Sequence, residues 1–269
     1  MLEALAAAND GLGIRETSRQ IGIDKSAVGR LLSQLQALDL VRKSAATGRY
    51  VVGPRLYALG ATLVAQDSMT RAARPIVKAL ATRFNETCYL GVRERAGFSF
   101  RVKFESTHAI RYVVDLGVMA PFHAGAGGRA ILAGMTRGEL EDALQELRLE
   151  PLTDATITDR AALETRIEKD RSRGFSVSLG ERVHESTAIA APFFDASGIC
   201  RGSIVFARPA VRHSDADVAE IGGAVLEAAQ ELSRRLGYVP EPDAVRGHHG
   251  ARRGAPGTGG RQARRVRDH

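Results

Sequence analysis

The sequence has few of the residues on which several protein classes depend. Its 269 residues include two cysteines and no tryptophan, and aromatic side chains make up 5% of the chain. Cys88 and Cys200 form no CxxC pair and no zinc-ligand spacing with the seven histidines. We therefore expect no disulfide framework, no metal site and no cofactor.

Long apolar runs are also missing. No run approaches the roughly 20 residues that a membrane-spanning helix needs. The first ten residues, MLEALAAAND, lack the basic start and the long apolar stretch of a secretory signal. The sequence therefore predicts a cytoplasmic protein that does not associate with membranes.

Charge is spread unevenly along the chain. The formal net charge is +7, and seven arginines against one aspartate after Val245 account for +6 of it. Residues 1–60 carry eight basic and five acidic residues, which is a modest excess. Because residues 239–269 are rich in Gly, Pro and Arg with few apolar side chains, we expect a disordered tail there. Binding to nucleic acid has to be judged from local patterns, since the global charge does not decide it.

Hydrophobic residues make up 44% of the chain, and its length suits two domains. Short helical patterns fill residues 1–53, and Pro54 opens an apolar helix over residues 54–67 that is suited to packing against a partner. The remainder, residues 69–238, alternates helices and strands, which indicates an α+β fold with a mixed or antiparallel sheet.

The expected elements of this second region follow from periodicity and turn signals. Helices are expected over 70–87 (kinked or started near Pro75), 127–135, 137–147, 159–174 and 214–237, with Ser214 as the N-cap of the last. Strands are expected within 88–106, where Ala96-Gly97 forms a turn, and over 110–117, 175–181, 186–195 and 199–209.

The segment from Gly22 to Gly53 has the pattern of a DNA-binding motif. Val28, Leu31, Leu32, Leu35 and Leu38 follow the spacing of a helix buried along one face. A shorter helix, IRETSRQIG, precedes it across a tight turn, and LVRKSAATGRYVVG follows it as a hairpin. The residues expected to contact DNA are Lys25, Ser26, Arg30 and Ser33 on the helix and Arg42, Lys43 and Arg49 on the hairpin. The alternative is an ordinary helical hairpin with a solvated basic face.

Three blocks of the sequence resemble the IclR family of bacterial transcription regulators. SAVGRLLSQL and GRYVVG are similar to the family's winged helix-turn-helix, and APFHAGAGGRAILA to its P-x-H-x-x-A-x-G-K-A segment. GFSVSLGERVHESTAIAAPFFDASG resembles its G-Y-x-x-S-x-G-E and I-A-A-P-x-F-D-x-x-G segments. The blocks occur in family order and span residues 2–238. Arg129 stands where the family usually has lysine, and the segment before LEALAAA is shorter than usual.

The resemblance implies the role of each region. Residues 1–53 would be a winged helix-turn-helix, 54–67 a linker helix, and 69–238 a GAF-like domain that binds a small-molecule effector and oligomerises. Effector positions carried over from the family motifs are Ala126, Gly127, Ser178, Ala188, Val205 and Ala207. Because most of these are apolar, we expect a hydrophobic effector, an organic or aromatic acid held by one or two polar anchors. The alternative for each position is packing of a sheet against a helix.

Other chemistry is less well supported by the sequence. His123 lies in one domain with Ser178 and Glu181, but no G-x-S-x-G motif accompanies them, so we expect no catalytic residue and a hydrogen-bonding role for His123. Glu181, His184 and Glu185 could ligate a metal ion, but no further well-spaced ligand accompanies them, so we expect no metal site there. A GAF-type redox enzyme or a sensor without specific DNA binding remains the alternative, and a redox enzyme would need an exposed cysteine thiolate.

The sequence therefore predicts a regulator, a repressor or an activator, that is not an enzyme. Its expected partners are double-stranded operator DNA, a small-molecule effector and further copies of itself, as a dimer or tetramer. A single winged domain reads few base pairs, and a dimer on a two-fold operator supplies the missing selectivity.

Overall fold

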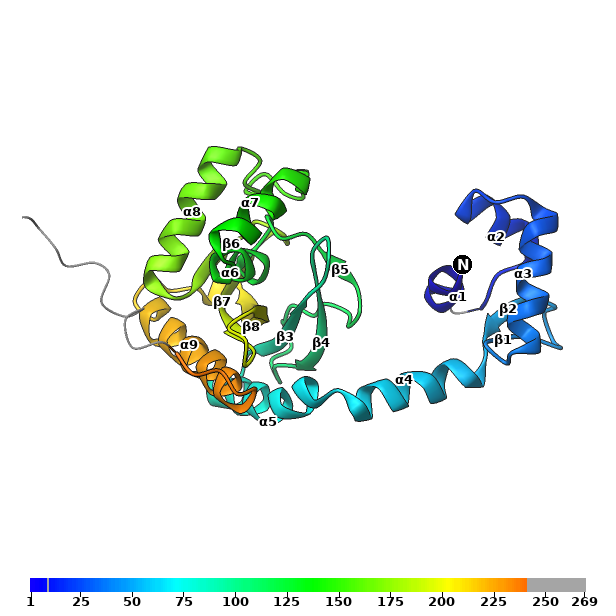
Figure 1. Ribbon diagram of the computed structural model, residues 1–269, viewed down its shortest axis with the longest axis horizontal. Coiled ribbons are helices and arrows are strands. Elements are labelled where there is room, and N and C mark those ends of the chain that lie inside the picture. Colours follow the sequence, from blue (N-terminus) through cyan, green and yellow to red (C-terminus); the bar gives the residue numbers. More distant parts are fainter. Residues whose placement is uncertain (9, 241–269) are drawn as a thin grey trace, which may run out of the picture. The chain divides into compact units, whose positions relative to one another are not determined.

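The computed structural model of the chain describes residues 1–8 and 10–240 (Figure 1). The expected tail at 239–269 lies, from residue 241 onward, outside the described residues. The helices are α1 (Leu2–Ala7), α2 (Ile14–Ile21), α3 (Lys25–Ala37), α4 (Pro54–Gln66), α5 (Ser68–Phe84), α6 (Ala126–Gly134), α7 (Arg137–Glu146), α8 (Arg160–Arg173) and α9 (Val218–Arg235), with a 3₁₀ turn at Ala210–Arg212. None of the described helices is long and apolar enough to cross a membrane.

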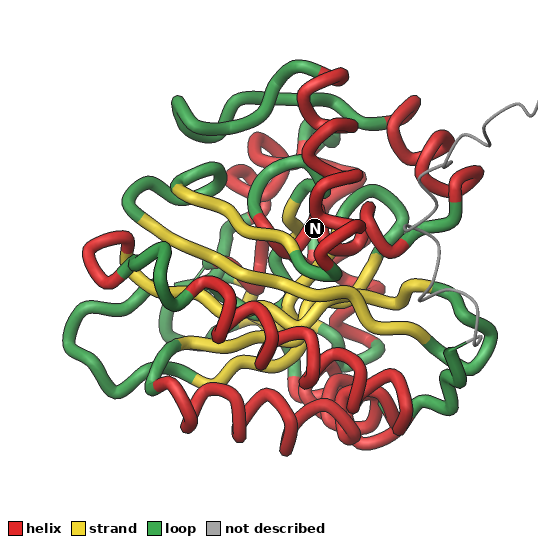
Figure 2. The backbone as a smooth tube through the Cα atoms, turned by 90° about the vertical axis from the view of Figure 1, so that its left-hand side faces the viewer, coloured by secondary structure: helices red, strands yellow, loops and turns green. Residues whose placement is uncertain are grey.

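Eight strands form two antiparallel sheets in the described residues. The strands are β1 (Val41–Lys43), β2 (Tyr50–Val52), β3 (Thr87–Arg93), β4 (Phe98–Phe104), β5 (Met119–Ala120), β6 (Ser176–Leu179), β7 (Ser186–Phe194) and β8 (Cys200–Pro209). The hairpin β1–β2 is one sheet, and the other six strands follow the order β5-β4-β3-β8-β7-β6. These six strands, drawn in yellow, run side by side in Figure 2. The fold is α+β, as the sequence predicts, and the larger sheet is purely antiparallel.

The larger sheet separates two hydrophobic cores because side chains alternate along its strands. Leu90 and Phe206 point to one face and pack with α5 and α9. Tyr89 and Val205, their neighbours in sequence, point to the other face and pack with α6, α7 and α8. Figure 1 shows these two groups of helices on opposite sides of the sheet. The expected effector positions lie on the α6 side.

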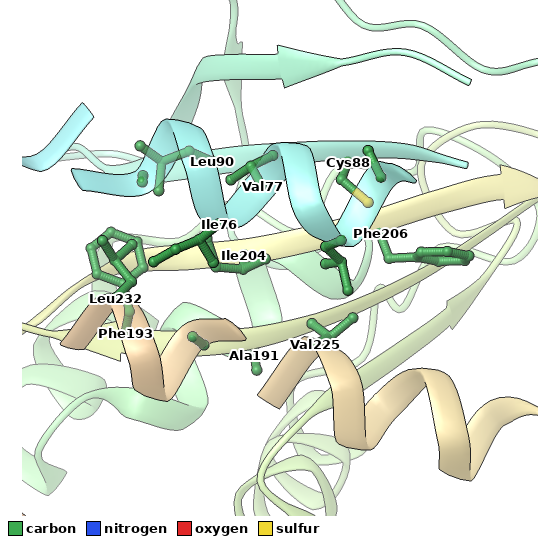
Figure 3. Close-up of a cluster of buried hydrophobic side chains, with 14 of the residues drawn as sticks. Ile76, Val77, Cys88, Leu90, Ala191, Phe193, Ile204, Phe206, Val225 and Leu232 are labelled. Carbon is green, nitrogen blue, oxygen red and sulfur yellow. The ribbon is translucent and has the colours of Figure 1, made fainter. Parts of the chain in front are cut away.

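Figure 3 shows part of the core between the sheet and the helices α5 and α9. Val77 of α5 and Val225 of α9 are fully buried against side chains of β3 and β8. Pro75 lies inside the continuous helix α5, which begins after Asp67, so the helix does not start at this proline. Cys88 belongs to this core and is buried in it.

Two expected elements are wrong. Residues 110–117 form no strand. Two of their backbone groups bond to the Tyr89 hydroxyl instead of to a neighbouring strand: the hydroxyl donates to the Tyr112 carbonyl (3.2 Å) and accepts from the Val114 N–H (3.0 Å). Ser214 is not the N-cap of the last helix. The carbonyl of Ser214 accepts from Asp217 in a preceding turn, and α9 begins one residue after Asp217.

Candidate functional site

The turn between α2 and α3 is fixed by backbone geometry and by a cap. Gly22 ends α2 in the left-handed conformation, which glycine adopts without strain. The Asp24 carboxylate accepts hydrogen bonds from the N–H groups of Ser26 (2.8 Å) and Ala27 (3.3 Å) and so caps α3. The Ser26 hydroxyl also donates to Asp24, and these bonds hold the pKa of the Asp24 carboxyl below its usual value. The start of α3 is therefore fixed by side-chain and backbone hydrogen bonds.

One face of α3 is buried and the other exposed. Val28 and Leu32 pack in a small core with Leu5, Val41 and Tyr50. The expectation that Leu31 and Leu38 are buried is wrong: they are 41% and 49% exposed, because α3 packs along a narrower stripe than its apolar pattern suggests.

The residues predicted on α3 share its exposed face. Lys25, Ser26, Arg30 and Ser33 are all exposed. The Ser33 hydroxyl donates to the Gly29 carbonyl (3.0 Å), and no described residue forms an ion pair with Lys25 or Arg30. These two cations can therefore reach a partner without first breaking a salt bridge.

The hairpin residues fall into two groups. Arg42 and Lys43 are exposed on β1, and the Lys43 ammonium lies 5.8 Å from the centre of the Tyr50 ring. Arg49 is instead held: it donates to the Gly11 carbonyl (3.0 Å) and forms an ion pair with Glu16 (2.6 Å). Arg49 therefore joins the hairpin to the start of α2, which the sequence pattern did not indicate.

A groove beside this ion pair contains two cations that the sequence reasoning missed. Arg15 and Arg19 of α2 line it together with Lys43 and Arg49. Their spacing of four residues on an exposed helix face was the available signal. The groove is thus a cationic surface next to the expected DNA-contacting residues.

The six expected effector residues line one cavity of about 60 Å³ on the α6 side of the larger sheet. They come from four elements: the start of α6, and the strands β6, β7 and β8. The remaining wall, which the sequence reasoning did not find, is formed by Tyr89, Phe98, Phe100, Tyr112, Val114, Ala124, Gly125, Arg182, Val183, Ser186 and Thr187. Residues more than 100 positions apart thus meet at one place.

The lining of this cavity is mostly apolar and aromatic. The ring centres of Tyr89 and Phe100 lie 4.5 Å apart, and those of Phe98 and Phe100 lie 5.3 Å apart. A Cβ atom on Gly127 would lie 3.1 Å from both Phe98 and Val205, so this position has little room for a side chain. Ser178 is 4% exposed, and its hydroxyl makes no hydrogen bond with any described residue.

The segment between β4 and β5 covers the cavity. The Tyr89 hydroxyl holds Tyr112 and Val114, as described above, and the Tyr112 hydroxyl donates to the His184 carbonyl (2.9 Å) on the opposite side. Burial raises the pKa of Tyr89 to about 12, so its hydroxyl keeps its proton at neutral pH.

A buried ionic cluster holds the start of α6. Arg129 is fully buried, and its guanidinium contacts the carboxylates of Asp170 (3.0 Å) and Glu181. It also donates to the Val177 carbonyl (2.5 Å), while Glu181 accepts from the Gly125 N–H (3.2 Å). Burial raises the pKa of the Glu181 carboxyl, and the charge of Arg129 opposes this shift. The cluster joins α6, α8 and β6 beside the cavity.

The histidine and the two cysteines considered for catalytic or redox chemistry lie in structural positions. Nε2 of His123 contacts the Glu150 carbonyl oxygen (2.9 Å) and so links two loops. Burial raises the pKa of both cysteine thiols, that of Cys200 to about 12, so neither is the exposed thiolate that the redox alternative requires. The described residues contain no group of three or more His, Cys, Asp or Glu side chains arranged to hold a metal ion.

Comparison with known proteins gives concordant results over most of the chain. Residues 61–234 match the family described as "Bacterial transcriptional regulator IclR C-terminal", and residues 1–45 match the IclR helix-turn-helix domain. The chain is 33% identical over 240 residues to the HTH-type transcriptional regulator BhcR of Paracoccus denitrificans, covering 89% of this chain and 85% of BhcR.

Solved structures of 19–24% identity share the fold. An IclR transcriptional regulator from Alicyclobacillus acidocaldarius superposes with a TM-score of 0.78 (24% identity, covering 88% of this chain and 95% of that one). An IclR homologue from Microbacterium hydrocarbonoxydans, solved in complex with 4-hydroxybenzoate, gives 0.74 (19% identity, covering 87% and 95%). The helix-turn-helix, the antiparallel sheet and the family matches together identify this chain as a member of the IclR family of bacterial transcriptional regulators.

Proposed function

We propose that this regulator binds double-stranded operator DNA sequence-specifically and that a small organic or aromatic acid in the cavity controls the binding. Residues 1–53 would bind the DNA, 54–67 would link the regions, and 69–238 would bind the effector and oligomerise. Whether the protein represses or activates depends on its operator.

The observation that carries the DNA-binding part is the set of exposed cations on α3 and β1. Lys25 and Arg30 have no ion-pair partner among the described residues, and they project from the N-terminal half of α3, the part that meets base edges in helix-turn-helix proteins. Arg42 and Lys43 on the hairpin are suited to phosphate contacts.

Arg15 and Arg19 extend this surface to α2, and we add them as phosphate contacts. Ser26 and Ser33 can still accept hydrogen bonds from DNA bases, and Arg49 would act mainly by holding the hairpin.

The effector part rests on the cavity. Its six predicted residues, Ala126, Gly127, Ser178, Ala188, Val205 and Ala207, surround one space with an aromatic wall and few polar groups, which suits an apolar body with one or two polar anchors. The 4-hydroxybenzoate complex of the Microbacterium homologue supports the view that this fold can hold an aromatic acid.

Replacing Arg30 tests the DNA-binding part. Arg30→Ala should lower the affinity for operator DNA more than the affinity for unrelated DNA, by about 1–3 kcal/mol if the guanidinium contacts a base. Fluorescence anisotropy with both DNAs measures this, and circular dichroism checks that the fold is unchanged. Arg137→Ala, which removes one exposed positive charge from α7, is the matched control and should change neither affinity. Equal losses on both DNAs would make Arg30 a phosphate contact and overturn its assignment.

A further inference from the structure

Arg182 lies over the aromatic wall of the cavity without a carboxylate partner. It follows Glu181 in the segment between β6 and β7. Its guanidinium carbon lies 5.6 Å from the centre of the Phe100 ring and 6.0 Å from that of Phe98. No hydrogen bond or ion pair joins it to any described residue.

The two arginines that are buried in the described residues are neutralised; Arg129 lies beside the cavity, and Arg208 lies on the opposite face of the sheet, over the Phe206 ring. Arg129 contacts Asp170 and Glu181, and Arg208 forms a two-pronged ion pair with Asp217 (2.8 and 2.9 Å). Burial lowers the pKa of the Arg182 guanidinium, and no carboxylate among the described residues opposes this shift. Arg182 is half-buried, and a partly desolvated cation without an anion is unfavourable, so the site gains free energy when an anion enters.

Two further anion-binding groups lie close to Arg182. A Cβ atom on Gly125 would lie 3.4 Å from the Arg182 Cβ and 4.0 Å from the Ser178 Oγ, so the three residues meet at one end of the cavity. The Ser178 hydroxyl is free to donate, and Gly125 precedes the first turn of α6, whose N–H groups have no partner within the helix. A guanidinium, a hydroxyl and a helix N-terminus together suit a carboxylate.

The rest of the cavity defines the body of the ligand. Its lining has no acidic residue and no cation besides Arg182. Phe98 and Phe100 offer ring faces, and Ala188, Val205 and Ala207 offer small apolar side chains. A second carboxylate on the ligand would be buried without a counter-ion.

Building on the proposed effector control, we propose that Arg182 is the residue that binds the effector's carboxylate and that the effector is a compact aromatic monocarboxylate. In the unliganded protein the guanidinium rests on the two phenylalanine rings. The ligand's ring takes that place, and its carboxylate meets the guanidinium, the Ser178 hydroxyl and the start of α6. Since the cavity measures about 60 Å³, Arg182 and the cover at Tyr112 move outward as the ligand enters.

Isothermal titration calorimetry on the full chain without DNA tests this assignment. The probes are benzoate, benzamide, which has the same shape without the charge, and benzene-1,3-dicarboxylate. Wild-type protein should bind benzoate at least about tenfold more tightly than either other probe, because a charge-assisted hydrogen bond to Arg182 is lost or a second charge is buried. Arg182→Gln should abolish the preference for benzoate over benzamide, and Arg182→Lys should restore part of it. Arg137→Gln should behave as wild type.

Two results would overturn the proposal: equal binding of benzoate and benzamide to wild type, including no binding of either at millimolar concentration, or an unchanged preference in a folded Arg182→Gln protein. Because no DNA is present, this outcome is separate from the proposed regulation. Carboxylate binding without operator binding would contradict the regulatory role alone. Operator binding without carboxylate binding would contradict the assignment of Arg182.

Discussion

Ser178 makes a sharp residue-scale test because its hydroxyl is buried at the cavity and bonded to nothing in the described structure. Removing it leaves no partner unsatisfied, so Ser178→Ala should change the free energy of unfolding by less than about 0.5 kcal/mol. The variant should bind operator DNA normally without effector and respond more weakly to effector. A gel shift with increasing effector measures both properties.

Ser176→Ala is the matched control for this change. Ser176 lies two residues earlier on β6, faces the same side, is fully buried and also lacks a hydrogen-bond partner, but it does not line the cavity. Its loss should leave the effector response unchanged. If Ser178→Ala loses effector-free DNA binding as well, Ser178 is a structural residue.

The candidate site could be predicted from the sequence only where a local motif carries it. Ala126 and Gly127 belong to such a motif, and the structure puts them at the cavity with the other four expected residues. Phe98 and Phe100 could not be found this way, because their place depends on the register of β4 against β3. Arg182 was missed because a lone arginine in a turn does not indicate what it faces.

At the scale of elements, the cluster around Arg129 should contribute strongly to stability. Arg129→Ala removes the main ion-pair partner of the buried Glu181 carboxylate and leaves it only Arg166 at 4.0 Å, while Asp170 keeps Arg173 (2.5 Å). Breaking a buried pair in this way destabilises a protein by about 3–5 kcal/mol. Urea unfolding followed by circular dichroism measures the change.

One control variant and one second variant at position 129 test whether the ion pair itself causes the loss of stability. Arg137→Ala, on the exposed surface of α7, should unfold like the wild type. Arg129→Met fills the same space without the charge, and it should also be destabilised because Glu181 still loses its main partner and keeps only Arg166 at 4.0 Å. Losses below about 1 kcal/mol in both variants would mean that the cluster holds α6 only weakly.

Helices and strands could be predicted from the sequence where a local residue signal itself determines the backbone conformation. The helix α8 ends at Gly174, which is left-handed as a stop signal requires, and the turn before β4 contains Ala96-Gly97, as expected. Residues 110–117 show why strand propensity alone fails. Their Tyr112 and Val114 cover a cavity and are held by the Tyr89 hydroxyl, a contact between segments that no local pattern encodes.

At the scale of the whole molecule, α4 presents apolar side chains that suit a second copy of the chain. Leu59 and Leu63 lie one turn apart and are 46% and 67% exposed. Exposed apolar side chains at this spacing are typical of helix pairing. The double variant Leu59→Glu/Leu63→Glu should shift the protein from an oligomer toward a monomer and reduce operator affinity, as sedimentation and gel shifts measure.

Ala58→Glu is the control for this surface. Ala58 is also exposed on α4 but lies away from the leucine face, so its replacement should leave the oligomer intact. An unchanged oligomer in the leucine variant would place self-association elsewhere, and a monomeric wild type would contradict the expected dimer.

The central claim is that this chain recognises a particular DNA sequence under the control of a small acid. The most direct test is a gel-shift titration of the full-length protein with its own upstream intergenic DNA against scrambled DNA of equal length. The upstream DNA should be retained selectively, and adding a carboxylate effector should change that retention. Equal, weak binding to both DNAs, lost when the chain is truncated after Gly237, would contradict this claim.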